Sequence, residues 1–293
     1  MNARGFLFGM MVTAVFSASV FSAWTEPVPV TEVNTQFEDW SPFLSFDGLT
    51  LYFARVRTSD SYYGRIFEAT RDEPIGPFKN VREVPGMINS LSNGHVFCPW
   101  VSCDNLRMYY TTQKSGIGWR LWFSERKTAS DPWPAGTEIL ELNRMGSYLV
   151  IPRLTVDELT IFFQAYNMTG GVGEHDIWMA SRTDRHLPFQ YIRNLTEINT
   201  IANEVHPNVS PDGLTLYFAS NRNLGQIYHI FKATRTSRDI PFSNIEHLSF
   251  LDKENKCSSF PNITSNAKTL YFIRYSPSNR ATQDIYVSYY LPD

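Results

Sequence analysis

The pattern of apolar and polar positions recurs five times along the chain, about every 55 residues. Each copy has a short apolar segment that contains a proline and, about ten residues later, an apolar–aromatic run. The prolines are Pro42, Pro99, Pro152, Pro207 and Pro261, and the runs are 51–53, 108–110, 161–163, 216–218 and 270–272. Short apolar runs bounded by turn residues are typical of strands, and a fixed period indicates a repeat architecture.

A turn separates the two segments of each copy. It contains a hydroxyl residue and, two positions later, Asp47, Asp104, Asp157, Asp212 or Asn266. Glycine follows the aspartate in the first and fourth copies, as tight hairpins favour, whereas the second and fifth copies lack it. A third strand is predicted at Ile- or Leu-aromatic pairs, and an outer strand beyond Pro-aromatic pairs, as at Ile139 to Leu142 and Ile192 to Leu195. Each copy therefore predicts four antiparallel strands.

Four-stranded units arranged radially form a β-propeller. The fifth copy ends after its third strand, whereas the segment Val30 to Asn34 resembles the outer segments Leu195 to Asn199 and Ile139 to Asn143. We therefore expect an all-β, five-bladed β-propeller of four-stranded antiparallel blades, with the last blade completed by the N-terminal strand 28–34. This closure would remove an exposed sheet edge. The predicted propeller spans 24–293, with repeats near 38–90, 95–147, 148–202, 203–255 and 257–293.

Residues 1–23 are predicted to be a signal peptide. Arg4 precedes an almost wholly apolar or small segment from Gly5 to Phe21, and the small residues Ser22 and Ala23 follow. The alternative is an uncleaved membrane anchor, but the apolar run is near the short limit for a span. We expect a secreted or periplasmic protein with no membrane span after signal cleavage.

Charge and cysteine content narrow the partners and the chemistry. The formal net charge is −3 and no basic stripe stands out, so no nucleic-acid partner is expected. The three cysteines, Cys98, Cys103 and Cys257, do not form a disulfide framework. Buried free thiols are favoured, and one disulfide among the three is left open.

The repeat resembles that of a known group of proteins. The segment Ser210 to Arg222 resembles the WD-repeat-like propeller repeat of the TolB type, and Asp176 to Ala180 and Asp284 to Tyr286 resemble its third-strand signature. The resemblance covers nearly all of residues 28–290. It implies a bacterial periplasmic or secreted propeller, often one that binds proteins or peptides and sometimes one attached to a hydrolase. No peptidase, kinase or other catalytic domain accompanies the repeats here.

The repeat also separates scaffold residues from candidate functional residues. A residue found in all five copies most simply serves the blade. Residues found once gather at the starts of the inner strands, at one rim of the central channel, where polar and aromatic side chains can form a ligand pocket. The candidate ligand-binding residues are Asp39, Trp40, His95, Trp100, Tyr148, Arg153, Glu204, His206 and Arg222. The alternative is that these groups satisfy one another, with Glu204 paired to Arg222 inside its own blade.

No catalytic constellation is assigned. His95, Glu204 and His206 could ligate zinc, but their spacing matches no established motif, so no metal and no cofactor are expected. The sequence predicts a non-catalytic extracytoplasmic propeller that recognises a protein, peptide or glycan at its loop-bearing rim. The alternative is a carbohydrate-active enzyme that uses rim carboxylates such as Asp39 and Glu204.

Overall fold

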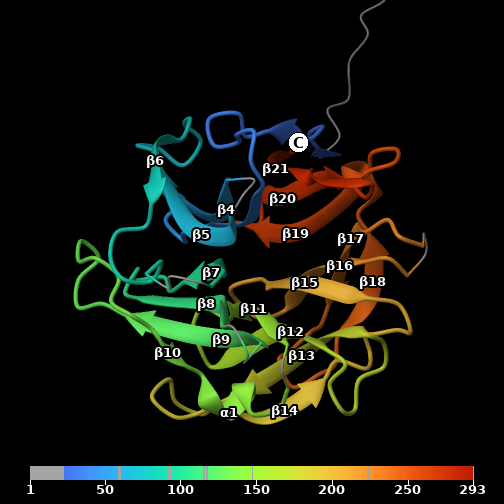
Figure 1. Ribbon diagram of the computed structural model, residues 1–293. Coiled ribbons are helices and arrows are strands. Elements are labelled where there is room, and N and C mark those ends of the chain that lie inside the picture. Colours follow the sequence, from blue (N-terminus) through green and yellow to red (C-terminus); the bar gives the residue numbers. More distant parts are fainter. Residues whose placement is uncertain are drawn as a thin grey trace, which may run out of the picture.

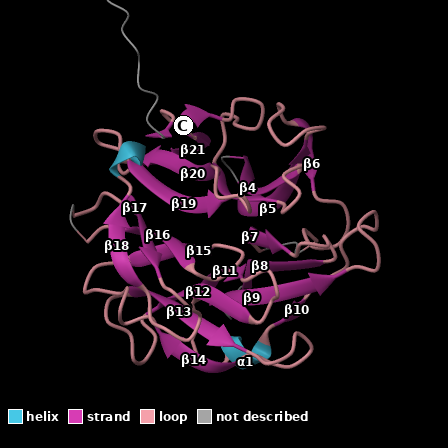
Figure 2. Ribbon diagram, turned by 180° about the vertical axis from the view of Figure 1, so that it is seen from behind, coloured by secondary structure: helices cyan, strands magenta, loops and turns pink. Residues whose placement is uncertain are grey.

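In the computed structural model the chain forms a five-bladed β-propeller, which confirms the predicted fold class (Figure 1). The structure describes residues 23–58, 61–90, 94–114, 116, 118–146, 148–222 and 225–292. Five antiparallel sheets surround a central axis, and the first strands of neighbouring blades contact one another around the ring. The view from behind shows the same ring, with the short helix α1 (Leu140–Asn143) at its edge (Figure 2).

Each blade is a meander that runs from the channel to the outside. The first blade contains β3 (Asp39–Leu44), β4 (Thr50–Thr58), β5 (Ser61–Thr70) and β6 (Lys79–Glu83). The second contains β7 (Val96–Val101), β8 (Arg107–Lys114), β9 (Gly118–Glu125) and β10 (Thr137–Glu138). The third contains β11 (Leu149–Leu154), β12 (Thr160–Tyr166), β13 (His175–Ser181) and β14 (Gln190–Asn194). The fourth contains β15 (Glu204–Val209), β16 (Thr215–Ser220), β17 (His229–Thr234) and β18 (Ser243–His247).

The fifth blade joins both ends of the described chain. It contains β19 (Cys257–Ile263), β20 (Thr269–Ser276) and β21 (Asn279–Leu291). Its outer edge is made by two short N-terminal strands, β1 (Ala23–Trp24) and β2 (Val28–Pro29), which both pair antiparallel with β21. The predicted closure by the N-terminal segment is therefore confirmed.

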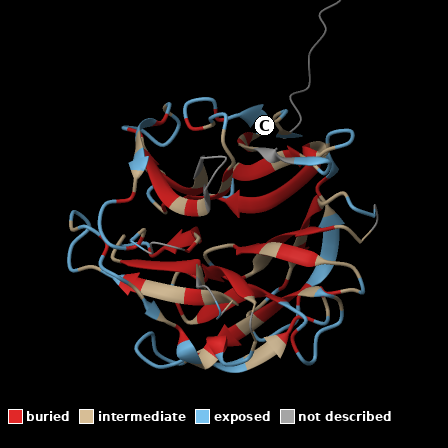
Figure 3. Ribbon diagram, viewed as in Figure 1, coloured by how far each residue is buried: buried red, intermediate tan, exposed pale blue. Residues whose placement is uncertain are grey.

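Burial falls from the inner strands to the outer ones (Figure 3). Every residue of β7, β11 and β19 is buried, whereas β6 and β18 contain no buried residue. The apolar–aromatic runs of the second strands supply much of the core, because their side chains fill the space between neighbouring sheets.

The five inner turns share one hydrogen-bond pattern. In the first blade Ser45 Oγ donates to Asp47 Oδ1 (2.5 Å), which also accepts from the Leu49 N–H (2.9 Å). The same pair of bonds recurs in the other four blades, with Asn266 replacing aspartate in the fifth. The residue after the acid is left-handed in every blade, including those without glycine: Gly48, Asn105, Glu158, Gly213 and Ala267. The side-chain bonds therefore hold a turn that glycine is not needed to form.

The segments predicted as outer strands are shorter strands followed by a turn. β10 ends at Glu138 and β14 at Asn194, so the prediction of a strand from Ile139 to Leu142 is wrong: 140–143 form α1. Likewise β2 ends at Pro29 and residues 31–33 form a turn, so the closing strand is shorter than the predicted 28–34. The resemblance among these segments reflects a shared asparagine that ends the turn.

That asparagine clamps the outer turn to the third strand of its blade. Asn199 Oδ1 accepts from the Ile177 N–H (2.9 Å) and its Nδ2 donates to the Ile177 carbonyl (2.8 Å). Asn34, Asn89 and Asn143 make the same two bonds to Ile285, Ile66 and Leu121. Because Asn34 bonds Ile285, this asparagine clamp also fastens the N-terminal segment to the fifth blade. The fourth blade has no such asparagine among its described residues.

Two predictions about the chain ends and the thiols bear on the described residues. The predicted signal peptide falls on 1–22, outside the described residues, apart from Ala23, which pairs with Leu291. In the part of the chain that the structure describes, no helix has the length and apolar character to cross a membrane. Cys98 and Cys257 are buried free thiols, and Cys103 is an exposed one.

Candidate binding site at the channel mouth

A cavity of about 540 Å³ opens where the inner strands begin. All five blades contribute to its wall, through the starts of the first strands, the ends of the second strands and the starts of the third strands. The loop-bearing rim and the inner-strand starts thus share one face of the propeller, as the meander order predicts. The described lining residues are Glu38, Trp40, Val56, His95, Phe97, Gln113, Trp119, Tyr148, Val150, Ile151, Gln164, His206, Phe260, Ile273, Tyr275 and Gln283.

A bulge in each inner strand shapes this wall. The residue before the proline of each repeat has a positive φ in all five blades: Ser41, Cys98, Ile151, His206 and Phe260. The pairing register between first and second strand shifts at each of these points. A β-bulge interrupts the in–out alternation of a strand and re-aims its side chains. Because the bulge is present in every blade, it belongs to the scaffold.

Aromatic rings form a continuous arc on one side of the cavity. The ring of Trp40 lies 4.8 Å from that of Phe97, which lies 4.9 Å from that of Trp119. Trp119 in turn lies 5.8 Å from Tyr148, all distances being between ring centroids. These spacings are typical of edge-to-face and tilted aromatic pairs. The rings therefore support one another and form a preformed apolar platform.

His95 adds a fixed hydrogen-bond donor to this arc. Its Nδ1 accepts from the Gly64 N–H (3.1 Å), so the neutral ring carries its proton on Nε2. Burial lowers the pKa of His95, and the nearby positive charge of Arg65 lowers it further. The ring is therefore neutral at pH 7. Its Nε2–H is a donor for an uncharged acceptor such as a hydroxyl or carbonyl oxygen.

Amide side chains supply most of the remaining polar groups. Gln164 is held in place, because its Nε2 lies 2.9 Å from His175 Nδ1 and its Oε1 accepts from the His206 N–H (3.3 Å). The side-chain amides of Gln113 and Gln283 make no hydrogen bond to another described residue. Among the described lining residues, Glu38 is the single carboxylate. The cavity thus combines aromatic faces with neutral donors and acceptors.

Four of the sequence-predicted site residues line the cavity: Trp40, His95, Tyr148 and His206. The imidazole of His206 stacks on Phe260 with 3.5 Å between ring centroids. The other five predicted residues, Asp39, Trp100, Arg153, Glu204 and Arg222, are absent from the lining.

The two predicted rim acids are buried inside their own blades. Asp39 is fully buried and its Oδ1 accepts from Arg55 Nε (2.6 Å). Burial raises the pKa of Asp39, and the Arg55 charge counteracts part of that rise. Glu204 is also fully buried and pairs with Arg222 (3.2 Å), as the alternative interpretation of the sequence held.

Arg55 and Arg222 play the same part in the first and fourth blades. Arg55 Nη2 donates to the Val33 carbonyl (2.6 Å), and Arg222 Nη2 donates to the Ile198 carbonyl (2.8 Å). Each arginine therefore joins the outer turn of the preceding blade to the inner strand of its own blade. Because the same arrangement occurs twice, we assign a structural role to the Asp39–Arg55 and Glu204–Arg222 ion pairs.

Trp100 and Arg153 are buried between blades. Trp100 is 2% exposed and packs against Phe43 and Tyr109, with ring centroids 6.0 and 5.6 Å away. Arg153 donates through Nη1 to the carbonyls of Pro152 (2.9 Å) and Pro99 (3.1 Å). Burial lowers the pKa of this guanidinium to about 10. Both side chains hold neighbouring inner strands together.

Sequence reasoning missed two of the four platform rings, Phe97 and Trp119, and the amides of Gln113 and Gln283. Trp119 is the second residue of β9, Gln283 lies in the first half of β21, and Gln113 lies near the end of β8. The signal that could have found them is positional: the same place in the repeat holds Gly64, Trp119, His175, Tyr228 and Gln283. The residue at this position differs in every blade, so it is a candidate for function by the same reasoning that set the repeated residues aside as scaffold.

Comparison with known proteins places the fold and not the function. No sequence-family description and no curated protein matches the chain. A thermostable family-43 glycoside hydrolase superposes with a TM-score of 0.58 at 10% identity, over 87% of this chain and 89% of that one. The α-L-arabinofuranosidase from Podospora anserina, in complex with cellotriose, gives 0.57 at 11% identity, over 90% and 95%.

TolB propellers are similar at the same level. The putative TolB from Agrobacterium tumefaciens gives a TM-score of 0.53 at 12% identity, over 91% of this chain and 97% of that one. TolB from Acinetobacter baumannii gives 0.50 at 12% identity, and the matched part covers 88% of this chain and 56% of that longer chain. At such identities the likeness shows the propeller fold alone. The resemblance to the TolB type is therefore supported at the level of the propeller architecture, and no sequence-family description matches this chain.

Proposed function

We propose that this protein is a non-catalytic extracytoplasmic binding protein that recognises a neutral glycan in the cavity at the channel mouth. The observation that supports this proposal is the lining itself: an arc of aromatic rings beside neutral donors and acceptors, contributed by all five blades. Of the three ligand classes that the sequence left open, protein, peptide and glycan, this chemistry favours the glycan. The extracytoplasmic location rests on the predicted signal peptide.

A sugar ring matches the two kinds of surface that the cavity offers. Its C–H faces can lie on the rings of Trp119 and Tyr148, as apolar ligand faces do in concave aromatic sites. Its hydroxyl groups both donate and accept, so they can bond the His95 Nε2–H and the Gln113 amide. A charged ligand would find Glu38 as the one carboxylate and no arginine or lysine among the described lining residues.

The carboxylates favour binding over hydrolysis. Glycosidases place two carboxyl groups on either side of the scissile bond. Here Asp39 and Glu204 are buried and each is paired with an arginine, which leaves Glu38 as the single described carboxylate of the cavity. The alternative of a carbohydrate-active enzyme therefore lacks the pair of acids on which it was based.

The test is a binding screen with matched variants. Neutral oligosaccharides and proline- or aromatic-rich peptides are screened by thermal shift, and hits are measured by titration calorimetry. We expect an oligosaccharide to bind, and Trp119→Ala or Tyr148→Ala to weaken it at least about tenfold, equivalent to about 1.4 kcal/mol. Tyr191→Ala removes an exposed tyrosine from the outer strand β14 and should leave affinity unchanged.

Two results would overturn the proposal. Binding of a peptide alone, lost in the same two variants, would make the mouth a peptide site. Hydrolysis of an oligosaccharide that disappears in Glu38→Gln would restore the enzyme alternative.

A further inference from the structure

The fourth blade breaks the asparagine clamp that the other four share. Its outer turn begins as theirs do, because the Leu248 N–H donates to the Ile230 carbonyl (2.9 Å) as the Leu195 N–H does to Ile177 (3.1 Å). Asn199 follows Leu195 by four residues, and the residue four beyond Leu248 is Asp252. An aspartate has thus replaced the clamping amide in this blade alone.

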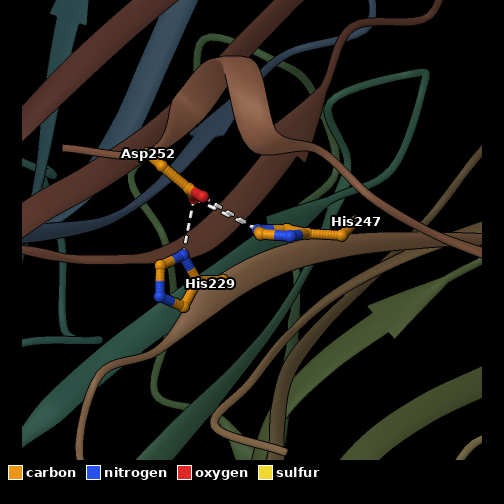
Figure 4. Close-up of side chains that lie close together, drawn as sticks. All are labelled: His229, His247 and Asp252. Carbon is orange, nitrogen blue, oxygen red and sulfur yellow. Dashed lines mark hydrogen bonds and ion pairs between the residues drawn. The ribbon is translucent and has the colours of Figure 1, made fainter. Parts of the chain in front are cut away.

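Asp252 turns toward two histidines (Figure 4). Its Oδ1 lies 2.6 Å from His229 Nδ1, and its Oδ2 lies 3.0 Å from His247 Nε2. The ligand atoms of all three side chains lie within 4.8 Å of one another. His229 begins β17, His247 ends the neighbouring strand β18, and Asp252 follows the 3₁₀ helix η1 (Ser249–Leu251).

We propose that His229, His247 and Asp252 form a binding site for a divalent transition-metal ion of the zinc class. Two imidazoles and one carboxylate are a donor set that suits Zn²⁺. A tetrahedral zinc site spaces its ligand atoms by roughly 3.3 Å, given bonds of about 2.0–2.1 Å. The two Asp252–histidine distances are those of hydrogen bonds, so they would lengthen by a few tenths of an ångström around an ion, and the two ring nitrogens, within 4.8 Å of each other, would adjust toward the same spacing.

Burial and packing prepare the three groups for this role. The side chain of His229 is 8% exposed, whereas those of His247 and Asp252 are each 29% exposed. The ring of His247 stacks on Phe231, with centroids 5.0 Å apart, which limits its rotation. The exposed side leaves an approach for the ion and a fourth coordination position for water.

The kinds of ligand atom in the cluster favour zinc over calcium or magnesium. Hard cations require several carboxylate or carbonyl oxygens, and this cluster has one carboxylate. The positive charge of Arg274, whose Nη2 donates to the Leu251 carbonyl (2.9 Å), acts on Asp252. Because this positive charge offsets part of the attraction between Asp252 and a cation, the two imidazole nitrogens must contribute to binding of the metal ion. A bound ion would join β17, β18 and the link to the fifth blade, and would take over the role of the missing clamp.

The test is a zinc titration of the full chain after its metals have been removed. We expect one Zn²⁺ per chain by calorimetry and elemental analysis, a rise in Tm on binding, and visible absorption bands when Co²⁺ replaces Zn²⁺. Asp252→Asn restores the residue that the other blades use, so it should fold without metal. It should nevertheless weaken zinc binding by roughly 100-fold or more, beyond the loss caused by removing an outer-shell partner.

Further variants keep the outcome decisive. His247→Gln should weaken binding as Asp252→Asn does, whereas His186→Gln and Cys103→Ser, at exposed surface positions, should not change it. Absence of stoichiometric binding, or affinity unchanged in both Asp252→Asn and His247→Gln, would overturn the proposal and leave a histidine–aspartate hydrogen-bond network.

Discussion

Four of the blades each have one arginine at the interface with the preceding blade. Arg71, Arg126, Arg182 and Arg235 lie over the aromatic residue of the Pro-aromatic pair, with the guanidinium carbon 4.0 to 4.6 Å from the ring centroid. Arg182 also donates to Tyr109 in the preceding blade (2.9 Å), and Arg71 donates to Tyr271 (3.3 Å). Arg71 and Arg182 thus combine a cation–π contact with a hydrogen bond across a blade interface.

Arg235 lacks the second of these contacts. The equivalent tyrosine of the preceding blade is replaced by Phe162, and Arg235 Nη2 is buried with no hydrogen-bond partner among the described residues. Phe162 faces Phe242 edge-on at 6.1 Å, much as Tyr271 faces Phe78 at 6.3 Å. The geometry that accepts a tyrosine hydroxyl in the fifth blade is therefore present in the third.

Phe162→Tyr is expected to stabilise the protein by about 1 kcal/mol, because the new hydroxyl gives Arg235 a buried hydrogen bond. Thermal or urea unfolding measures the change. The reverse substitution at the matching site, Tyr271→Phe, should cost a similar amount. A lower Tm for Phe162→Tyr would show that the third interface has no room for the hydroxyl.

The inner turn between the first and second strands carries a carboxylate that links folding to pH. Partial burial acts to raise the pKa of Asp104, but hydrogen bonds from Ser102, Arg107 and the Leu106 N–H outweigh it and lower the pKa to about 2. The pKa of Asp157 is lowered by a similar set of bonds. A carboxylate whose pKa is lower in the folded state stabilises it above the unfolded pKa, and this contribution is lost as the pH falls through the folded value.

The free energy of unfolding should therefore decrease as the pH falls from about 4 toward about 2. Tm measured across this range checks the expectation. Asp104→Asn keeps the acceptor of the turn, as Asn266 does in the fifth blade, but removes the titration. It should reduce the slope of Tm against pH, and an identical slope in the variant would contradict the assignment.

The sequence predicts these elements unequally. The hydroxyl–acid pair predicts the inner turns even where glycine is lacking, because the side chains bond the backbone locally. The outer strands were misplaced because the segments Val30 to Asn34 and Ile139 to Asn143 look like strands, whereas their asparagine bonds a strand far away in the sequence. A long-range bond of this kind leaves no local signal.

For the whole molecule, the side chains of the site were harder to predict than its place. The repeat locates the inner-strand starts at one rim, and Trp40, His95, Tyr148 and His206 do line the cavity there. The bulge before each proline shifts the register between paired strands, so strand alternation could not show that Asp39 and Glu204 are buried. Subtracting the repeated residues located the rim, but it did not separate residues that line the cavity from those in buried ion pairs, such as Asp39 and Glu204.

Closure of the ring by the N-terminal segment should contribute strongly to stability, because it combines strand pairing, hydrogen bonds and burial of apolar side chains. β2 pairs with β21, Asn34 clamps Ile285, and Ser288 Oγ donates to the Thr25 carbonyl (2.7 Å). Val30 and Val33 are buried in a core cluster that also includes Ile285 and Val287.

Removal of residues 28–36 should expose this edge and lower Tm by on the order of 10 °C, as several kcal/mol does in a domain of this size. Asn34→Ala, which removes only the clamp, should lower Tm by a smaller amount. If the deletion leaves Tm unchanged, the propeller is not held closed by its N-terminal segment.

We propose that the aromatic mouth of the channel is the binding site of this protein. A crystal structure with the tightest-binding neutral oligosaccharide from the screen tests it most directly. We expect a sugar ring against Trp119 or Tyr148, with a hydroxyl within hydrogen-bond distance of His95 Nε2 and the cavity filled. A saccharide bound on the outer strands or between blades, with the mouth empty, would contradict it.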